Sequence, residues 1–180
     1  MENKNKINFI VENFSIKEKK GKEGVFITGL ALPFEKTSRN GILYSKESVT
    51  KTGKTLEGKP MFFNHNIEGL PIGKVEKVNI KKDGLYYEAR LIPTTEEEKA
   101  IVEKVKAGLL QNVSIQCIYE NPEYNKELDI FKVDVKEFLE LSVVGVPGFA
   151  DTTAMVIEKL KENQEIMKLK KKLEKKLPLS

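Results

Sequence analysis

Residues 72–92 read IGKVEKVNIKKDGLYYEARLI, and this stretch decides the fold class. Two runs with the β-branched and aromatic content of strands flank Lys-Lys-Asp-Gly, and Asp83-Gly84 is a strong signal for a β-hairpin turn. The second run alternates apolar with more polar residues, the apolar set being Leu85, Tyr87, Ala89 and Leu91. Because successive side chains of a strand point to opposite faces, this run predicts a half-buried strand.

The sequence on both sides of the hairpin continues as short strands broken by turn residues. Further strand-like segments occupy residues 24–34, 112–120, 129–135 and 138–147. A polar, loop-like stretch follows the first of them, with Asn40-Gly41 as a turn signal and a short helix at residues 45–49. We therefore predict a mainly antiparallel β domain with one or two packed helices.

One internal helix is well specified by its ends. Thr95 and Glu98 have the spacing of a capping box, and Gly108 is a natural stop. Between them an apolar stripe is formed by Ile101, Val102 and Val105. This pattern predicts a helix that packs one face against the sheet.

The composition limits the classes of protein that the chain can belong to. A length of 180 residues with 32 % charged and 39 % hydrophobic residues suits one compact domain. No apolar run approaches the roughly 20 residues of a membrane span, so we expect no membrane partner. The scarcity of cysteine favours location in a reducing cytoplasm. With one cysteine and one histidine, the chain has no internal disulfide framework and no plausible zinc cluster, so we expect no metal or cofactor.

The positive charge is concentrated at the C-terminal end. Residues 155–180 hold eight lysines and four glutamates, which accounts for the whole formal net charge of +4. We divide the chain into a domain at residues 1–154 and a basic, helical or partly disordered tail at residues 155–180. A basic tail says little about a DNA-reading surface on the domain itself.

Two strand-like segments carry polar residues that need an explanation. In residues 112–120, alternation places Cys117 with the apolar residues of the core face and turns Ser114 to the other face. In residues 138–147, alternation places Glu140 on the face of Phe138 and Ser142. The pattern alone favours a solvated serine and a solvated carboxylate, since a buried carboxylate needs a partner.

Serine hydrolysis combines a hydroxyl, an imidazole that accepts its proton, and a group that orients the imidazole. His65 is the only histidine, so it is the only imidazole base available. Sequence spacing alone does not bring His65, Ser114 and Glu140 together.

The order of motifs resembles the prohead, or capsid maturation, proteases of tailed bacteriophages over roughly residues 24–157. The resemblance is carried by G-L-A-x-P, a strand ending in His65, Ile72-Gly73, a G-L-x-x hairpin strand, K-A-G-L-L, Val113-Ser114-Ile115 and L-E-L-S-V-V with Pro147. That family is related in fold to the herpesvirus assemblins, which implies an antiparallel β-barrel ringed by helices.

The resemblance also implies roles for single residues. The strand-end histidine of the family falls on His65 as general base, and the serine after the helix falls on Ser114 as nucleophile. The L-E-x-S strand offers Glu140 as third member, with Asp134 as the alternative acid. The assemblins use a second histidine, which this chain lacks, so an acid must serve or the site is a dyad.

The function implied is a serine endopeptidase that acts inside the assembling procapsid in the host cytoplasm. Its substrates would be scaffold protein, the scaffold-like arm of the major capsid protein, and the protease itself, with self-association as a further expectation. The alternative is a catalytically inactive module of the same fold that binds capsid or scaffold. A nucleic-acid-binding barrel is a third reading, weakened because no stretch interleaves aromatic residues with Lys or Arg.

Overall fold

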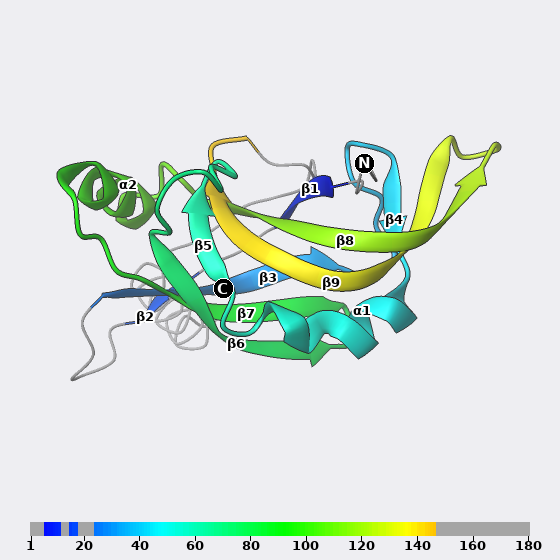
Figure 1. Ribbon diagram of the computed structural model, residues 1–180, viewed down its shortest axis with the longest axis horizontal. Helices are drawn as coiled ribbons and strands as arrows, with labels where there is room; N and C mark the ends of the chain where they lie inside the picture. Colours follow the sequence, from blue (N-terminus) through cyan, green and yellow to red (C-terminus); the bar gives the residue numbers. More distant parts are fainter. Residues whose placement is uncertain (1–5, 12–14, 18–23, 147–180) are drawn as a thin grey trace, which may run out of the picture.

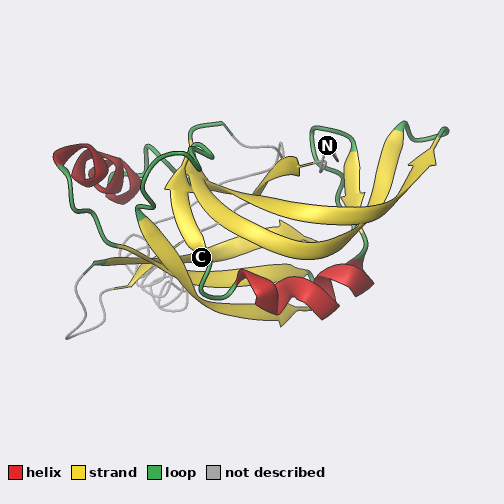
Figure 2. Ribbon diagram, in the orientation of Figure 1, coloured by secondary structure: helices red, strands yellow, loops and turns green. Residues whose placement is uncertain are grey.

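The computed structural model describes residues 6–11, 15–17 and 24–146, and these residues form one curled, mixed β-sheet with a few helices (Figures 1 and 2). The strands are β1 (Lys6–Val11), β2 (Ser15–Lys17), β3 (Val25–Pro33), β4 (Ile42–Tyr44), β5 (Pro60–Phe63), β6 (Gly73–Lys81), β7 (Gly84–Leu91), β8 (Asn112–Asn125) and β9 (Ile130–Val144). The helices are α1 (Lys46–Thr52), the 3-10 helix η1 (Gly53–Leu56) and α2 (Glu96–Lys106). The strand order is β1-β8-β9-β5-β6-β7-β3-β2, and β4 pairs with β9.

The hairpin predicted from residues 72–92 is confirmed as β6 and β7. The apolar residues of β7 are fully buried, as the alternation predicted. The two residues that turn the chain are Lys82 and Asp83, because Lys81 already pairs with Gly84. A side chain on Gly84 would collide with Leu30 and with the backbone of Leu32, so this glycine permits the close approach of β3 rather than the turn itself.

The core lies between the two parts of the curled sheet. Figure 1 shows β8 and β9 as long, curved strands that pass over the part of the sheet formed by β3, β6 and β7. Side chains from both parts belong to one buried hydrophobic cluster. Leu85 and Tyr87 enter it from β7, and Ile115 and Cys117 enter it from β8. The predicted core face of residues 112–120 is therefore confirmed.

The prediction of a mainly β domain with a few helices is confirmed, but the predicted antiparallel barrel is not, because the sheet is mixed. β4 pairs in parallel with residues 131–133 of β9, and β5 pairs in parallel with residues 141–143. The chain leaves β4, passes through α1 and η1, and enters β5 while advancing in the same direction as β9. One long strand therefore receives two shorter parallel partners, joined by a helical crossover.

Two predicted strands at residues 129–135 and 138–147 are joined in the structure as β9, which runs without a break from Ile130 to Val144. The predicted helical tail and the predicted boundary at residue 154 lie outside the described residues. Among the described residues no helix is both long and apolar enough to cross a bilayer.

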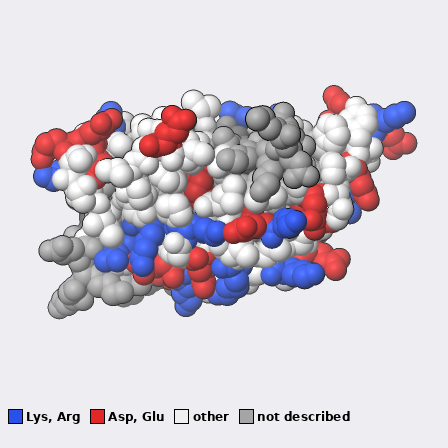
Figure 3. All heavy atoms as spheres, viewed as in Figure 1, with Lys and Arg blue, Asp and Glu red and all other residues white. Residues whose placement is uncertain are grey.

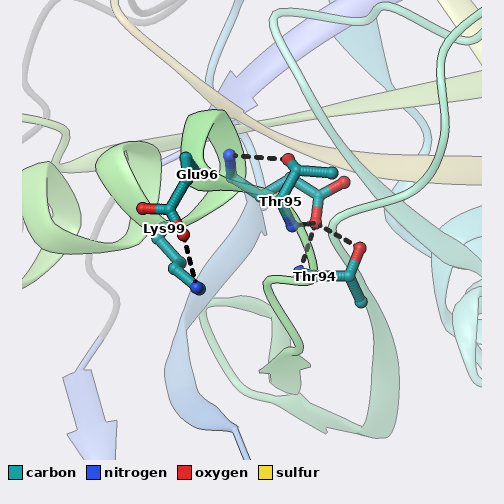
Figure 4. A network of polar contacts seen from close by, with 5 residues as sticks. Thr94, Thr95, Glu96 and Lys99 are labelled. Carbon is teal, nitrogen blue, oxygen red and sulfur yellow. Dashed lines mark hydrogen bonds and ion pairs between the residues drawn. The ribbon is translucent and has the colours of Figure 1, made fainter.

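The capping box predicted for α2 is confirmed (Figure 4). The Glu98 backbone N–H donates to Thr95 Oγ1 at 3.2 Å, and the Glu98 carboxylate accepts from the Thr95 backbone N–H at 3.1 Å. The same carboxylate accepts from the backbone N–H and the hydroxyl of Thr94, at 2.5 and 2.9 Å. These bonds fix the start of α2, the helix that leads into β8.

Charged side chains of both signs share the surface shown in Figure 3. Lys and Arg side chains alternate with Asp and Glu side chains along the lower half of this face, where β6 and β7 lie in Figure 1. Such a mixture is typical of a solvated protein surface.

We expect Thr95→Ala to lower the free energy of unfolding by about 1 kcal/mol, because it removes the side-chain cap of α2. Denaturant titration followed by circular dichroism measures this. Thr50→Ala is the matched control, since the Thr50 hydroxyl only donates to the Lys46 carbonyl within α1, and we expect a change of less than about 0.5 kcal/mol. Equal effects of the two substitutions would contradict the capping role.

The Thr94 backbone N–H, followed by the Thr94 hydroxyl, holds the pKa of Glu98 below its ordinary value of 4.5. A carboxyl with a lowered folded-state pKa stabilises the fold above its unfolded pKa, and this contribution is lost as pH falls through the folded pKa. We therefore expect wild type to exceed Glu98→Gln in stability at pH 7, with a gap that narrows below about pH 4.5. Denaturant titrations between pH 7 and pH 3 test this, and a gap that widens in acid would contradict it.

Candidate active site

Three neighbouring strands bring the candidate residues together. β9 pairs with β8 on one side, where Ser114 lies opposite Ser142, and with β5 on the other, where Phe62 lies opposite Ser142. His65 follows β5 by two residues. The three chain segments therefore meet where these neighbouring strands end.

A chain of short polar contacts joins Ser114, His65 and Glu140. Ser114 Oγ lies 2.5 Å from His65 Nε2, and His65 Nδ1 lies 2.7 Å from Glu140 Oε1. Because a carboxylate only accepts, the imidazole donates its Nδ1–H to Glu140, which leaves Nε2 to accept from the Ser114 hydroxyl. This is the tautomer in which the imidazole can take a proton from serine.

All three side chains are largely withdrawn from water. Ser114 is 0 % and Glu140 1 % exposed, and the His65 side chain is 15 % exposed. The sequence pattern favoured a solvated serine and a solvated carboxylate, and both expectations are wrong. The carboxylate is buried because the imidazole and a neighbouring hydroxyl satisfy it.

A β-bulge sets the face on which Glu140 lies. Gln116 pairs with Glu140 and Cys117 pairs with Phe138, so Leu139 is an extra residue in β9. Phe138 therefore packs in the core, while Glu140 and Ser142 turn to the face of Ser114. Simple alternation had placed Glu140 with Phe138, and the inserted residue overturns that expectation.

The turn that carries His65 adopts an unusual backbone conformation. Asn64 and His65 have φ angles of 49° and 57°, in the left-handed region that non-glycine residues seldom occupy. The Asn64 backbone N–H donates to the Val143 carbonyl at 2.8 Å, and the Gly145 backbone N–H donates to Asn64 Oδ1 at 3.1 Å. Both bonds tie the turn to the end of β9. Backbone strain of this kind is concentrated at functional sites.

The alternative acid, Asp134, is not brought to His65. Its carboxylate accepts from Asn121 Nδ2 at 3.0 Å in an exposed part of the β8–β9 hairpin. It precedes Glu140 by six residues in the same strand, which corresponds to roughly 20 Å. Glu140 is therefore the acid that contacts the imidazole.

Cys117 lies in β8 on the core side, where it is fully buried. Burial raises the pKa of its thiol to about 12. The thiol is therefore neutral at physiological pH and lacks the thiolate that nucleophilic attack requires.

A groove of about 450 Å³ opens beside the His65 turn. Asn64 and Asn66, which flank His65, belong to its lining. Its apolar walls come from the end of β5, the β5–β6 connection and α2, and they include Phe63, Leu70, Ile72 and Ile101. A groove of this kind can accept an extended peptide next to the polar contacts.

Sequence reasoning assigned no role to Ser142, although this residue contacts both Glu140 and His65. Its hydroxyl donates to Glu140 Oε2 at 2.5 Å and accepts from the His65 backbone N–H at 3.2 Å. The signal that could have found it is the spacing of two residues from Glu140, which places both side chains on one face of a strand.

The chain is similar to known proteins of two bacteriophages. The chain is 29 % identical over 139 residues to the prohead protease of Escherichia phage T5, a match that covers 76 % of this chain and 65 % of the relative. Its fold is similar to the capsid assembly protease of bacteriophage T4, with a TM-score of 0.58 and 17 % identity over 78 % of this chain and 99 % of that one. At that identity the likeness concerns the fold alone. A family model described as caudovirus prohead serine protease matches residues 12–166. Since this match spans most of the sequence, the chain belongs to the caudovirus prohead serine protease family.

Proposed function

We propose that the chain is a serine endopeptidase of procapsid maturation, with Ser114 as nucleophile, His65 as general base and Glu140 as the acid that orients the imidazole. The observation that carries the proposal is the relay from the Ser114 hydroxyl through both ring nitrogens of His65 to the buried Glu140 carboxylate. Family membership supports the reaction class, and together with the T5 relative it supports a role in prohead maturation.

The geometry suits acyl transfer. The Ser114 oxygen attacks the carbonyl carbon of the scissile peptide while its proton passes to His65 Nε2, and the negative Glu140 stabilises the imidazolium that forms. His65 then gives this proton to the leaving amine nitrogen, which breaks the peptide bond and leaves an acyl ester on Ser114. A water that loses its proton to His65 hydrolyses the ester and restores the serine.

The substrates in this proposal are scaffold protein and the scaffold-like arm of the major capsid protein, with cleavage of the protease itself as a further step. The groove supports a polypeptide substrate, because Asn64 and Asn66 on either side of His65 line it and its apolar walls can hold the side chains of an extended chain. The site of action would be the interior of the assembling procapsid.

We expect Ser114→Ala and His65→Ala each to abolish cleavage of the cognate scaffold and capsid proteins. Nucleophile and base act as a unit, so either loss lowers the rate on the order of 10⁶-fold, whereas Glu140→Gln costs less. Mass spectrometry of the incubated proteins measures cleavage, and circular dichroism verifies the fold.

Wild-type turnover by Ser114→Ala would contradict the assignment of the nucleophile. Binding of scaffold or capsid protein without cleavage by the wild-type protein would favour the alternative, an inactive binding module.

We expect a fluorophosphonate to label Ser114, and Cys117→Ala to keep full activity, because the buried thiol is neutral. Peptide mapping of the labelled protein identifies the modified residue. Inactivation of the wild-type protein by iodoacetamide, absent from Cys117→Ala, would reverse this assignment.

A further inference from the structure

The hydroxyl of Ser142 lies between the acid and the base of the proposed triad. Ser142 is 0 % exposed, and its single hydroxyl proton is directed to Glu140 Oε2 at 2.5 Å. Its oxygen also accepts the His65 backbone N–H at 3.2 Å. Ser142 therefore contacts both the Glu140 carboxylate and the main chain of His65, whose imidazole is bonded to that carboxylate.

These contacts account for both oxygens of the Glu140 carboxylate. Oε1 accepts from His65 Nδ1–H and Oε2 accepts from Ser142. Glu140 is 1 % exposed, so bulk water is a poor substitute for either partner. Without the Ser142 hydroxyl, Oε2 would be buried with one fewer donor, and the carboxylate would rotate or draw in water to satisfy it.

The position of Ser142 in the sheet explains why a small side chain stands there. It is the central residue of a row across three strands, opposite Ser114 in β8 and Phe62 in β5. Glu140 lies two residues before Ser142 on the same face of β9, about 7 Å away along the strand, so the short serine side chain meets the end of the longer glutamate side chain.

We propose that Ser142 is a positioning residue of the active site, which fixes the Glu140 carboxylate in the orientation that holds the His65 imidazole. This inference rests on the proposed function, since it adds a fourth member to the relay of Ser114, His65 and Glu140. Ser142 acts through Glu140 and has no contact with the Ser114 hydroxyl proton that is transferred. Supporting bonds of this kind to catalytic groups are a general means of preorganisation.

The test uses the rate at which diisopropyl fluorophosphate modifies Ser114, which requires no knowledge of the natural substrate. In this reaction the Ser114 oxygen bonds to phosphorus, fluoride leaves, and the serine proton passes to His65 Nε2. The rate therefore reports how well the imidazole is held as a base.

We expect Ser142→Ala to slow labelling about tenfold or more, because the loss of a hydrogen bond to a charged group has an effect of that size. In a Glu140→Ala background, the same change is expected to slow labelling less than about threefold, because no carboxylate remains to be positioned. Ser142→Cys, which keeps a weak donor of similar shape, is expected to label at a rate between those of wild type and Ser142→Ala.

The single histidine provides a spectroscopic readout. Every imidazole signal in the NMR spectrum belongs to His65, so the Nδ1–H resonance that reports its bond to Glu140 is identified without ambiguity. We expect this resonance to shift or broaden in Ser142→Ala. A merely structural serine elsewhere would leave it unchanged.

Ser48→Ala is the matched control. The Ser48 hydroxyl also donates to an oxygen, the Ser45 carbonyl at 2.8 Å, and accepts from a β9 backbone N–H, that of Val135 at 2.9 Å. Because Ser48 makes no contact with the relay, its removal is expected to lower stability while leaving labelling and the His65 resonance unchanged.

Labelling of Ser142→Ala at the wild-type rate would overturn the inference while leaving the proposed function intact. An equal loss in the wild-type and Glu140→Ala backgrounds would also overturn it, since Ser142 would then act independently of the carboxylate. Failure of the wild-type protein to react at Ser114 would instead contradict the proposed function itself.

Discussion

The pairing of β9 with a strand on each side is the constraint on which the rest of the structure depends. β8 and β5 both hydrogen-bond to the same short segment of β9, around Leu141 and Ser142. Ser114 and the His65 turn are thereby held on opposite sides of the residues that carry the carboxylate. These two ladders set the distances between the three side chains. A shift of one residue in the pairing of a strand would turn its side chains to the other face of the sheet.

The bulge at Leu139 reconciles two demands on one strand. The first part of β9 must place Phe138 in the core, whereas the later part must direct Glu140 and Ser142 to the site. With strict alternation, residues 138, 140 and 142 would share one face, so a core phenylalanine and a site carboxylate could not both be accommodated. A single inserted residue changes the phase of the strand between them.

The parts of the fold that sequence reasoning predicted are those in which local chemistry decides the outcome. The Thr95–Glu98 capping box, the alternation of residues 85–91 and the core position of Cys117 all depend on side chains close in sequence. The parallel direction of β4 and β5 was not predictable in this way, since a strand's own residues do not encode the direction of its partner. The burial of Ser114 and Glu140 was also missed, because it depends on contacts with His65, which is distant in the sequence. The residue types of the candidate site came from the family resemblance, and the role of Ser142 only from the three-dimensional contacts.

The distances along the chain between the members of the relay have a consequence for when the site can exist. His65 is separated from Ser114 by 49 residues and from Glu140 by 75. Ser114 and Glu140 lie on the two arms of the β8–β9 hairpin, whereas the His65 turn reaches them only through the long-range pairing of β5 with β9, so the site appears only after both pairings have formed. Such long-range pairings are slow steps in folding, since their loop-closure entropy must be met before the contacts form. A chain still being synthesised lacks both the contact of His65 with Ser114 and the buried Glu140 carboxylate until β8 and β5 have paired with β9. The topology itself thus delays the proposed chemistry until these strand pairings are complete.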